Sequence, residues 1–344
     1  MHRAMRGEFK ESSINVRAMN YTELAIRRPS ASLSTIRGIV GTLPVPLFFS
    51  GSSGPLGNNF RHPQIMNIRS LFAAFSLLLI LLPGCSYTVK EEMLFNERPL
   101  TPLTKQFHFA DIYFTVDDTI NINGWMLTKD SAVANILLLH GNSNNLYESP
   151  WINIINALGK LNVNVLAIDY RGFGRSSGNV SFNGLYRDAQ GALRYLKSTS
   201  YGSKPIIVYG LSLGSIPAVD IAQNPDVSGL ILEGALSSSE DYVEAIKEYH
   251  WYLRLINIEY GKDVIFDSVN KIKNIKPPVL IIHGNHDNLP EWMSKKLYDA
   301  VNHSNKSFYT VENGIHCDTY RVDASQYFSK LLAFINQCVM LDQQ

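Results

Sequence analysis

Short apolar runs alternate with stretches of helical periodicity along residues 106–340. Runs of three or four apolar residues are typical of parallel strands that are buried on both faces of a sheet. The runs are residues 136–139, 165–168, 206–208, 230–232 and 279–282. Between them, apolar residues recur at helical spacing. The helical sets are Ile152, Ile155 and Leu158; Leu185, Ala189, Ala192, Leu193 and Leu196; and Ala324, Tyr327, Phe328, Leu331, Leu332 and Ile335. This alternation predicts one α/β domain with a doubly wound, mostly parallel sheet.

Two further patterns complete this domain. Apolar and polar residues alternate over 112–116 and 120–126, on either side of Asp117 and Asp118, which predicts two antiparallel strands joined by a turn. Residues 237–272 form an insert between two strands, and we expect a short helical cap over the active site. The insert is crowded with apolar side chains: Tyr242, Tyr249, Trp251, Tyr252, Leu253, Leu255, Ile256 and Tyr260. The alternative is that these aromatic residues only pack the cap onto the body of the domain.

The chain before residue 106 has a different character. Residues 1–65 have no sustained period and contain Ser/Gly/Pro clusters, so we expect them to be disordered; their Arg-rich and Ser-rich composition also fits a transit peptide. In residues 66–84, an arginine precedes a twelve-residue run, 71–82, that is apolar except for Ser76. Such a run is too short to span a bilayer and fits a signal peptide. The alternative is a short buried helix.

Residues 82–85 (LPGC) resemble the cleavage box of a bacterial lipoprotein, although proline stands where a small residue is usual. The resemblance implies lipidation of Cys85, a tether over residues 85–105, and a protein anchored to the membrane on the periplasmic side of a bacterial envelope. Because a signal peptide works only at the start of a chain, we expect translation to begin at Met66, which makes residues 1–65 an upstream extension. The alternative is an uncleaved chain that starts at Met1.

Charge and cysteine content narrow the possible functions. Residues 1–65 hold eight Lys/Arg and three Asp/Glu, and Arg69 is the only charged residue of 66–84, so the total of +1 leaves residues 85–344 with a net charge of −5. A mildly acidic body without a basic stripe argues against nucleic acid as a partner. The three cysteines, Cys85, Cys317 and Cys338, show no metal-ligand spacing. Cys317 and Cys338 could pair in an oxidising compartment or remain free thiols.

The most informative motif is the G-x-S-x-G sequence at residues 210–214. An apolar, β-branched run precedes it and an apolar helical pattern follows it. A serine between strand and helix lies on a sharp turn that exposes its hydroxyl. Gly210 and Gly214 relieve the crowding in that turn, so Ser212 is the candidate nucleophile. The alternative is a surface glycine turn with a bystander serine.

A serine nucleophile needs a base, and the base needs an acid to orient it. Asp287 follows the strand at 279–282 and is the candidate acid; the alternative is a loop carboxylate that caps a helix. His316 follows the strand at 308–311 and is the candidate base; the alternative is a surface histidine. His283 and His286 lie near Asp287, but the loop supplies no convincing further ligand, so we expect no metal.

An acyl-transfer intermediate also needs two preorganised N–H donors for its oxyanion. The backbone N–H of Leu213, directly after the candidate nucleophile, is one candidate. The second should come from the loop after the first parallel strand, residues 140–143 (HGNS). Gly141 lets this backbone turn, and the N–H of Asn142 is the second candidate. The alternative is an ordinary loop at the start of a helix.

Several motifs in one order resemble the α/β-hydrolase superfamily and, within it, the compact lysophospholipase-like and depalmitoylase-like esterases. They are HGNS at 140, DYRGFGRSSG at 169–178, GLSLG at 210–214, FDS at 266–268, PPVLIIHGNHD at 277–287 and GIHCD at 314–318. The resemblance covers residues 107–337 and implies the same fold and the triad roles of Ser212, Asp287 and His316. The segment 169–178 is expected to be structural, fixing the loop beside the site.

These observations favour a serine hydrolase that cleaves a small carboxylic ester or thioester without a cofactor. Two alternatives stay open. A serine peptidase or aminopeptidase would use the same triad. A binding protein that kept the fold and lost catalysis is a second alternative, although such proteins usually lack a triad member and this chain lacks none.

Overall fold

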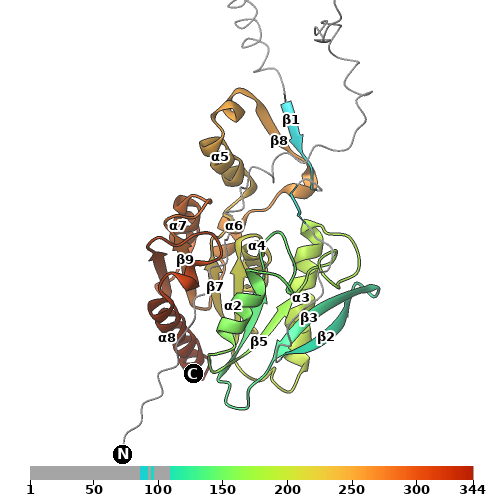
Figure 1. Ribbon diagram of the computed structural model, residues 1–344, viewed down its shortest axis with the longest axis vertical. Helices are drawn as coiled ribbons and strands as arrows, with labels where there is room; N and C mark the ends of the chain where they lie inside the picture. Colours follow the sequence, from blue (N-terminus) through green and yellow to red (C-terminus); the bar gives the residue numbers. More distant parts are fainter. Residues whose placement is uncertain (1–85, 92–93, 97–108, 344) are drawn as a thin grey trace, which may run out of the picture. The chain divides into compact units, whose positions relative to one another are not determined.

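A mixed sheet forms the centre of the computed structural model, which describes residues 86–91, 94–96 and 109–343 (Figure 1). In this part of the chain its eight strands lie in the order β10-β9-β7-β6-β4-β5-β3-β2. They are β2 (Ala110–Val116), β3 (Ile120–Leu127), β4 (Ala134–Leu139), β5 (Val163–Ile168), β6 (Ile206–Leu211), β7 (Val227–Glu233), β9 (Val279–Gly284) and β10 (Lys306–Val311). Each apolar run of the sequence therefore lies within a strand, as predicted.

The strand directions also follow the prediction. Strands β4, β5, β6, β7, β9 and β10 pair in parallel with one another. Strands β2 and β3 form the predicted antiparallel hairpin, in which Val116 faces Ile120. Asp117 and Asp118 turn the chain with positive φ angles of 54° and 61°. Because the parallel strands share one direction, the loops after β4, β6, β9 and β10 meet at the same edge of the sheet.

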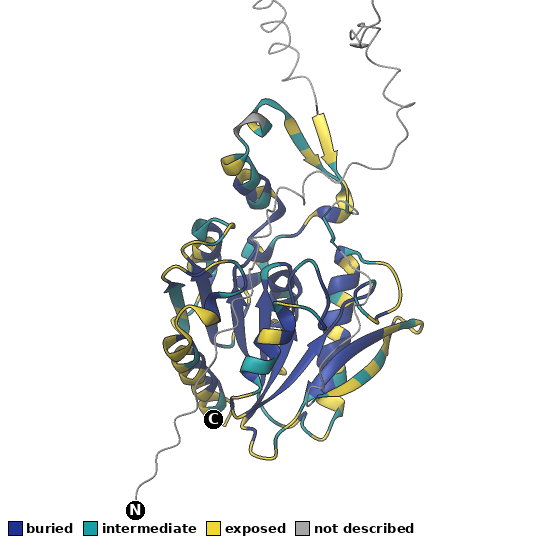
Figure 2. Ribbon diagram, in the orientation of Figure 1, coloured by how far each residue is buried: buried dark blue, intermediate teal, exposed yellow. Residues whose placement is uncertain are grey.

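Helices cover both faces of the sheet and bury its apolar side chains (Figures 1 and 2). One face packs against α3 (Phe182–Ser198), α4 (Ser215–Ile221), α6 (Ser268–Ile272) and α7 (Glu291–Ala300). The other packs against α2 (Trp151–Leu158) and α8 (Ala324–Asp342). Most of the predicted helix positions point inward: Leu185, Ala189 and Leu331 are fully buried. The prediction was wrong for Ala324 and Leu332, which are exposed, and successive helix residues point about 100° apart, so Leu332 is turned away from the buried face of Leu331. Full burial of a leucine side chain contributes about 1.5–3 kcal/mol to stability. The arrangement of sheet and helices is the expected α/β-hydrolase fold.

The insert between β7 and β9 is only partly the helical cap that the sequence predicted. It contains α5 (Ser239–Tyr249), the 3-10 turns η6 (Trp251–Leu255) and η7 (Lys262–Val264), strand β8 (Asn257–Tyr260), and α6. Strand β8 was not expected, because its partner comes from far away in the sequence. That partner is β1 (Ser86–Val89), which pairs with it in parallel (Figure 1).

Strand β1 also changes the interpretation of residues 85–105, which the sequence suggested were a plain tether. We call the described part of this segment, residues 86–91 and 94–96, the strap. The strap contacts the domain: Val89, Leu94 and Phe95 pack against its core. The predictions for residues 1–65, for the signal-like segment 66–84, for Cys85 and for a start at Met66 lie outside the described residues. In the described part of the chain, no helix combines the length and apolar character needed to cross a membrane.

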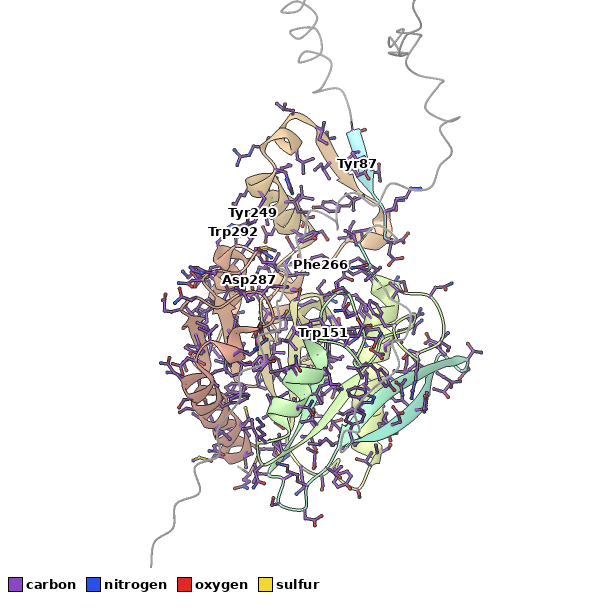
Figure 3. All side chains as sticks on the ribbon, in the orientation of Figure 1. Tyr87, Trp151, Tyr249, Phe266, Asp287 and Trp292 are labelled. Atoms are coloured by element: carbon purple, nitrogen blue, oxygen red, sulfur yellow. The ribbon has the colours of Figure 1, made fainter. Side chains whose placement is uncertain are left out.

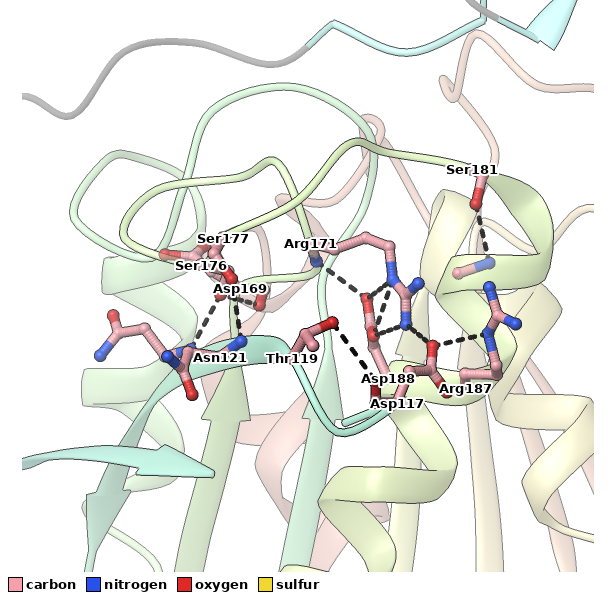
Figure 4. Close-up of polar contacts among 12 residues, drawn as sticks. Asp117, Thr119, Asn121, Asp169, Arg171, Ser176, Ser177, Ser181, Arg187 and Asp188 are labelled. Atoms are coloured by element: carbon pink, nitrogen blue, oxygen red, sulfur yellow. Dashed lines mark hydrogen bonds and ion pairs between the residues drawn. The ribbon is translucent and has the colours of Figure 1, made fainter. Parts of the chain in front are cut away.

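A buried ion pair fixes the loop at residues 169–178 (Figure 4). The guanidinium of Arg171 bonds Asp188 through Nη2 at 2.7 Å and Nε at 3.0 Å, and the backbone N–H of Arg171 donates to Asp188 at 2.8 Å. The same guanidinium reaches Asp117 in the hairpin turn at 3.0 Å. Asp188 is fully buried. Burial raises the pKa of Asp188, and the charge and hydrogen bonds of Arg171 oppose the rise. The ion pair therefore gives the loop at residues 169–178 a structural role.

Replacing Arg171 with methionine should therefore destabilise the fold. Asp188 would lose its guanidinium, and breaking one side of a buried pair costs about 3–5 kcal/mol. The folded-state pKa of Asp188 would rise further, so stability should fall as pH rises and the loss should be smaller at pH 5 than at pH 8. Urea unfolding at the two pH values measures this.

Arg187→Met is the matched control. Arg187 pairs with the same Asp117 at 2.9 Å, but its side chain is 52% exposed, and such pairs contribute at most about 1 kcal/mol. Equal losses in the Arg171 and Arg187 variants would contradict the structural role of the buried pair.

Candidate active site

Ser212 lies on a tight turn between β6 and α4. Its φ angle is +51°, and it begins the 3-10 turn η5 (Ser212–Gly214) that leads into the helix. A Cβ on Gly210 would lie 2.6 Å from the carbonyl oxygen of Gly214, and a Cβ on Gly214 would lie 2.1 Å from the carbonyl oxygen of Leu139. Real side chains do not fit at those distances, so the turn requires both glycines.

Three side chains that are far apart in the sequence meet at this turn. His316, in the loop after β10, has its Nε2 atom 2.8 Å from Ser212 Oγ. Its Nδ1 atom lies 2.8 Å and 2.9 Å from the two carboxylate oxygens of Asp287, in the loop after β9. The structure thus brings together the candidate nucleophile, base and acid in the geometry that proton transfer from serine to histidine requires.

Asp287 is held in its charged form. Its side chain is 1% exposed. Burial alone would raise its pKa, but the charge and hydrogen bond of His316 and the backbone N–H of Leu289 outweigh burial and hold the pKa below its usual range. The carboxylate is therefore ionised near neutral pH. An ionised acid can orient the imidazole and stabilise the imidazolium that forms during proton transfer.

The loops that carry Asp287 and His316 are joined directly. A Cβ on Gly284 would lie 2.3 Å from the carbonyl oxygen of Gly314, so glycine is needed where the loops approach. The backbone N–H of His286 donates to the carbonyl of Gly314 at 2.9 Å. Gly234, directly after β7, contacts the pair formed by Asp287 and His316. Its φ is +54°, and an added Cβ would lie 3.0 Å from His316. The sequence interpretation missed Gly234; a glycine directly after a buried strand was the available signal.

The two candidate oxyanion donors flank the nucleophile. Leu213 follows Ser212 at the start of η5. On the other side, a Cβ on Gly141 would lie 3.0 Å from the Cβ of Ser212, which places the loop after β4 against the nucleophile. Asn142 is the next residue of that loop, and its backbone N–H forms no hydrogen bond with another described residue. An open N–H at this position suits an oxyanion donor.

A buried carboxyl group behind the site was also missed. Glu233, at the end of β7, is 1% exposed. It accepts hydrogen bonds from Tyr209, from Tyr327 at 2.8 Å and from Thr319 at 2.6 Å. Burial raises its pKa. Because Thr319 lies three residues after His316, Glu233 holds the loop that carries the histidine. A charged residue at the end of the apolar run 230–232 was the signal for it.

The histidine and the two cysteines nearest the triad have structural surroundings. His283 is buried between Ser294 at 2.9 Å and the carbonyl of Leu289 at 3.0 Å, and burial lowers its pKa. Within residues 86–91, 94–96 and 109–343, no group of three His, Cys, Asp or Glu side chains could hold a metal ion. Cys317 and Cys338 are both free and buried.

Three tyrosines of the cap with described side chains have two kinds of surroundings. Tyr242 and Tyr260 pack against the core of the domain. Tyr249, at the end of α5, is 58% exposed, and partial burial together with the charge of Asp287 raises its pKa. The neighbouring Glu248 accepts a hydrogen bond from Trp292 Nε1 at 3.2 Å. Figure 3 shows Tyr249 and Trp292 on the Asp287 side of the molecule, so the end of α5 lies near the candidate acid.

Comparisons with known proteins place this fold among the α/β hydrolases. A family model described as serine aminopeptidase, S33, matches residues 130–262. The α/β hydrolase domain-containing protein WAV2 of Arabidopsis thaliana is 29% identical over 78% of this chain and 90% of its own. Protein bem46 of Schizosaccharomyces pombe is 29% identical over 70% of this chain and 81% of its own. The Pyrococcus furiosus esterase Pf2001 superposes with a TM-score of 0.59 at 18% identity, over 70% of this chain and 97% of that one.

The chain has the α/β-hydrolase fold that its sequence motifs implied. The family match over residues 130–262 and the relatives at 29% identity support a place in the α/β-hydrolase superfamily.

Proposed function

We propose that the protein is a serine hydrolase that cleaves carboxylic esters or thioesters through an acyl-enzyme on Ser212. The observation that carries the proposal is the continuous hydrogen-bond chain from Ser212 Oγ through His316 to Asp287. The loop of Gly141 and Asn142 beside Ser212 supports it, because acyl transfer needs oxyanion donors next to the nucleophile.

The reaction follows from these positions. His316 Nε2 takes the proton of Ser212 Oγ while the oxygen attacks the substrate carbonyl carbon. The oxyanion accepts hydrogen bonds from the N–H groups of Leu213 and Asn142, each worth about 3 kcal/mol of transition-state stabilisation. The C–O or C–S bond then breaks, and the leaving group takes the proton from His316. A water molecule next gives a proton to His316 and attacks the acyl carbon. The bond from that carbon to Ser212 Oγ then breaks, Oγ takes the proton back from His316, and the acid leaves.

We infer an apolar acyl group for the substrate. The cap is rich in aromatic side chains, and one of them, Tyr249, lies near Asp287. We infer that the cap forms an apolar acyl pocket, in which an extra methylene gains about 0.8 kcal/mol until the pocket is full. A hydrolase with this pocket should prefer short-to-medium acyl chains to acetate.

A graded substrate panel tests this function. With p-nitrophenyl esters of increasing chain length, kcat/KM should rise about threefold to fourfold per methylene and then level off. Acyl-thioesters of the same lengths should follow the same order. A flat profile would contradict the acyl pocket. Absence of ester and thioester cleavage by a folded protein would contradict the proposed function.

The same panel should include aminoacyl amides, because the matching family model carries the description serine aminopeptidase. A peptidase would use the same Ser212, His316 and Asp287 and differ in the pocket that binds the peptide terminus. Faster cleavage of aminoacyl amides than of every ester would favour this second function.

We further propose that a lipid on Cys85 anchors the protein to a membrane. The proposal rests on the signal-like segment 66–84 and the LPGC sequence. Two or more acyl chains bind a protein stably to a membrane, whereas a single chain gives only marginal membrane binding. Expression of the natural gene should give a membrane-bound protein whose mass fits a lipidated chain beginning at Cys85. Cys85→Ser should remain uncleaved at this position. An unchanged mass in that variant, or a purified N-terminus at Met1, would contradict the anchor.

A further inference from the structure

The side chain of Asn142 is held by the strap rather than by the sheet. Its Oδ1 atom accepts hydrogen bonds from the backbone N–H of Asn96 at 2.9 Å and, within its own loop, from the backbone N–H of Ser143 at 3.0 Å. Its Nδ2 group donates to the backbone carbonyl of Leu94 at 2.6 Å. An asparagine side chain carries one acceptor and two donor hydrogens, so it satisfies both backbone groups of the strap at once. A residue of the candidate oxyanion loop is thus fixed by a segment that lies more than 40 residues earlier in the chain.

The strap is itself attached to the domain at several points. Phe95 packs on Phe182 of α3 with ring centroids 5.1 Å apart, and Phe182 stacks on Phe266 of the cap insert at 5.8 Å. The carboxylate of Glu91 accepts a hydrogen bond from the backbone N–H of Phe182. Further along, β1 pairs with β8 of the cap, which Figure 1 shows. These contacts give Leu94 and Asn96 a defined position from which to hold Asn142.

The loop that contains Asn142 needs such support. Ser143 and Asn144 follow it with φ angles of 75° and 60°, a region that side chains with a Cβ seldom adopt. Conformations of this kind persist where the surrounding structure fixes them. Trp151 Nε1 supports the loop after Asn142 by donating to the carbonyl of Ser143 at 2.9 Å. The strap supports Asn142 itself, which directly follows Gly141, the residue in contact with Ser212.

We propose that the backbone N–H of Asn96 and the backbone carbonyl of Leu94, and not their side chains, position the active site. Through the side chain of Asn142 they set the backbone N–H of that residue at the point where the oxyanion forms. This inference rests on the proposed function, because an oxyanion forms there only when Ser212 attacks an acyl group. The strap is then a working part of the hydrolase, in addition to being the connection that follows the proposed lipid anchor.

Two substitutions at Asn96 distinguish the role of its backbone N–H from the role of its side chain. Asn96→Pro in the full chain removes the N–H that donates to Asn142, whereas Asn96→Ala keeps this N–H and removes only the side chain. A small misplacement of a catalytic group can cost on the order of 100-fold in rate. We expect kcat of the proline variant on a p-nitrophenyl ester to fall roughly 10-fold to 100-fold with little change in KM. The alanine variant should stay within about twofold of wild type, because the donor remains.

A double-mutant cycle shows whether the loss passes through Asn142. Asn142→Ala keeps its own backbone N–H and loses both strap contacts together with the bond from Ser143, so it should lower kcat at least as much as Asn96→Pro. If the two changes break the same contact, the double variant Asn96→Pro/Asn142→Ala should be no slower than the slower single variant. Independent, multiplying losses would overturn the proposal. So would a proline variant whose activity falls only in proportion to its loss of folded protein, measured by thermal unfolding.

The rate of Ser212 labelling by a fluorophosphonate supplies a readout that does not depend on the choice of substrate. In that reaction Ser212 Oγ bonds to phosphorus and fluoride leaves, while the P=O oxygen occupies the oxyanion position. Wild-type labelling with slower labelling of Asn96→Pro, but not of Asn96→Ala, supports the strap. Equal labelling rates in all three overturn the strap and leave the proposed function standing. A folded wild type that does not label overturns both.

Discussion

Ser212→Ala is expected to lower kcat about 10⁶-fold while the protein stays folded. The serine, histidine and aspartate of a triad act as a unit, so loss of the nucleophile removes nearly the whole contribution of the unit. Ser212 Oγ is the atom that His316 Nε2 contacts at 2.8 Å, and the alanine variant has no group that could replace it. The change removes one oxygen from a partly exposed side chain, so the thermal midpoint should hardly move.

Fluorophosphonate labelling and ester turnover measure this prediction together. Wild type should label and turn over substrate, and Ser212→Ala should do neither. Equal labelling of both proteins would show that another residue is the nucleophile. A folded wild type that neither labels nor hydrolyses any substrate of the panel would favour the alternative of a binding protein that kept the fold.

Local sequence patterns predicted the fold because the sheet is encoded by short, continuous signals. The apolar runs that became β4 and β6 are fully buried on both faces, so their sequences show no alternation that could be mistaken for a surface strand. The exposed face of β2 does alternate with its buried face, and its hairpin was predicted from that pattern. The parallel strands share one direction, so the loops that follow them lie at one edge of the sheet. The positions of Ser212, Asp287 and His316 in those loops were enough to predict the triad.

The features that sequence patterns missed depend on contacts between distant segments. Strand β8 has only four residues, and nothing local distinguishes it from a loop until β1 pairs with it. The strap binds the side chain of Asn142 through backbone groups of Leu94 and Asn96. Backbone groups are the same in every residue, so these contacts have no sequence signature. Glu233 was visible as a charge at the end of a strand, but its three hydroxyl partners come from β6, the His316 loop and α8.

Asp287→Asn should lower kcat about 10⁴-fold, because the acid of a triad selects the histidine tautomer. The carboxylate accepts the Nδ1–H of His316, which leaves Nε2 free to take the proton of Ser212. An asparagine can present its NH₂ group to Nδ1 instead, which favours the tautomer that carries its proton on Nε2. That tautomer cannot act as a base toward Ser212. Steady-state kinetics on the best ester of the panel measure the loss.

Glu233→Gln is the matched control, since Glu233 is a second buried carboxyl group close to the same histidine loop. Its oxygens bond to Thr319 and two tyrosines rather than to His316, and its pKa is raised by burial, whereas the pKa of Asp287 is lowered. Because its pKa lies below the usual range of an aspartate, Asp287 stays ionised near neutral pH and its protonation should not limit kcat/KM between pH 5 and 8. We expect Glu233→Gln to keep most of kcat and to lose stability. A larger kcat loss in Glu233→Gln than in Asp287→Asn would assign the orienting acid to Glu233.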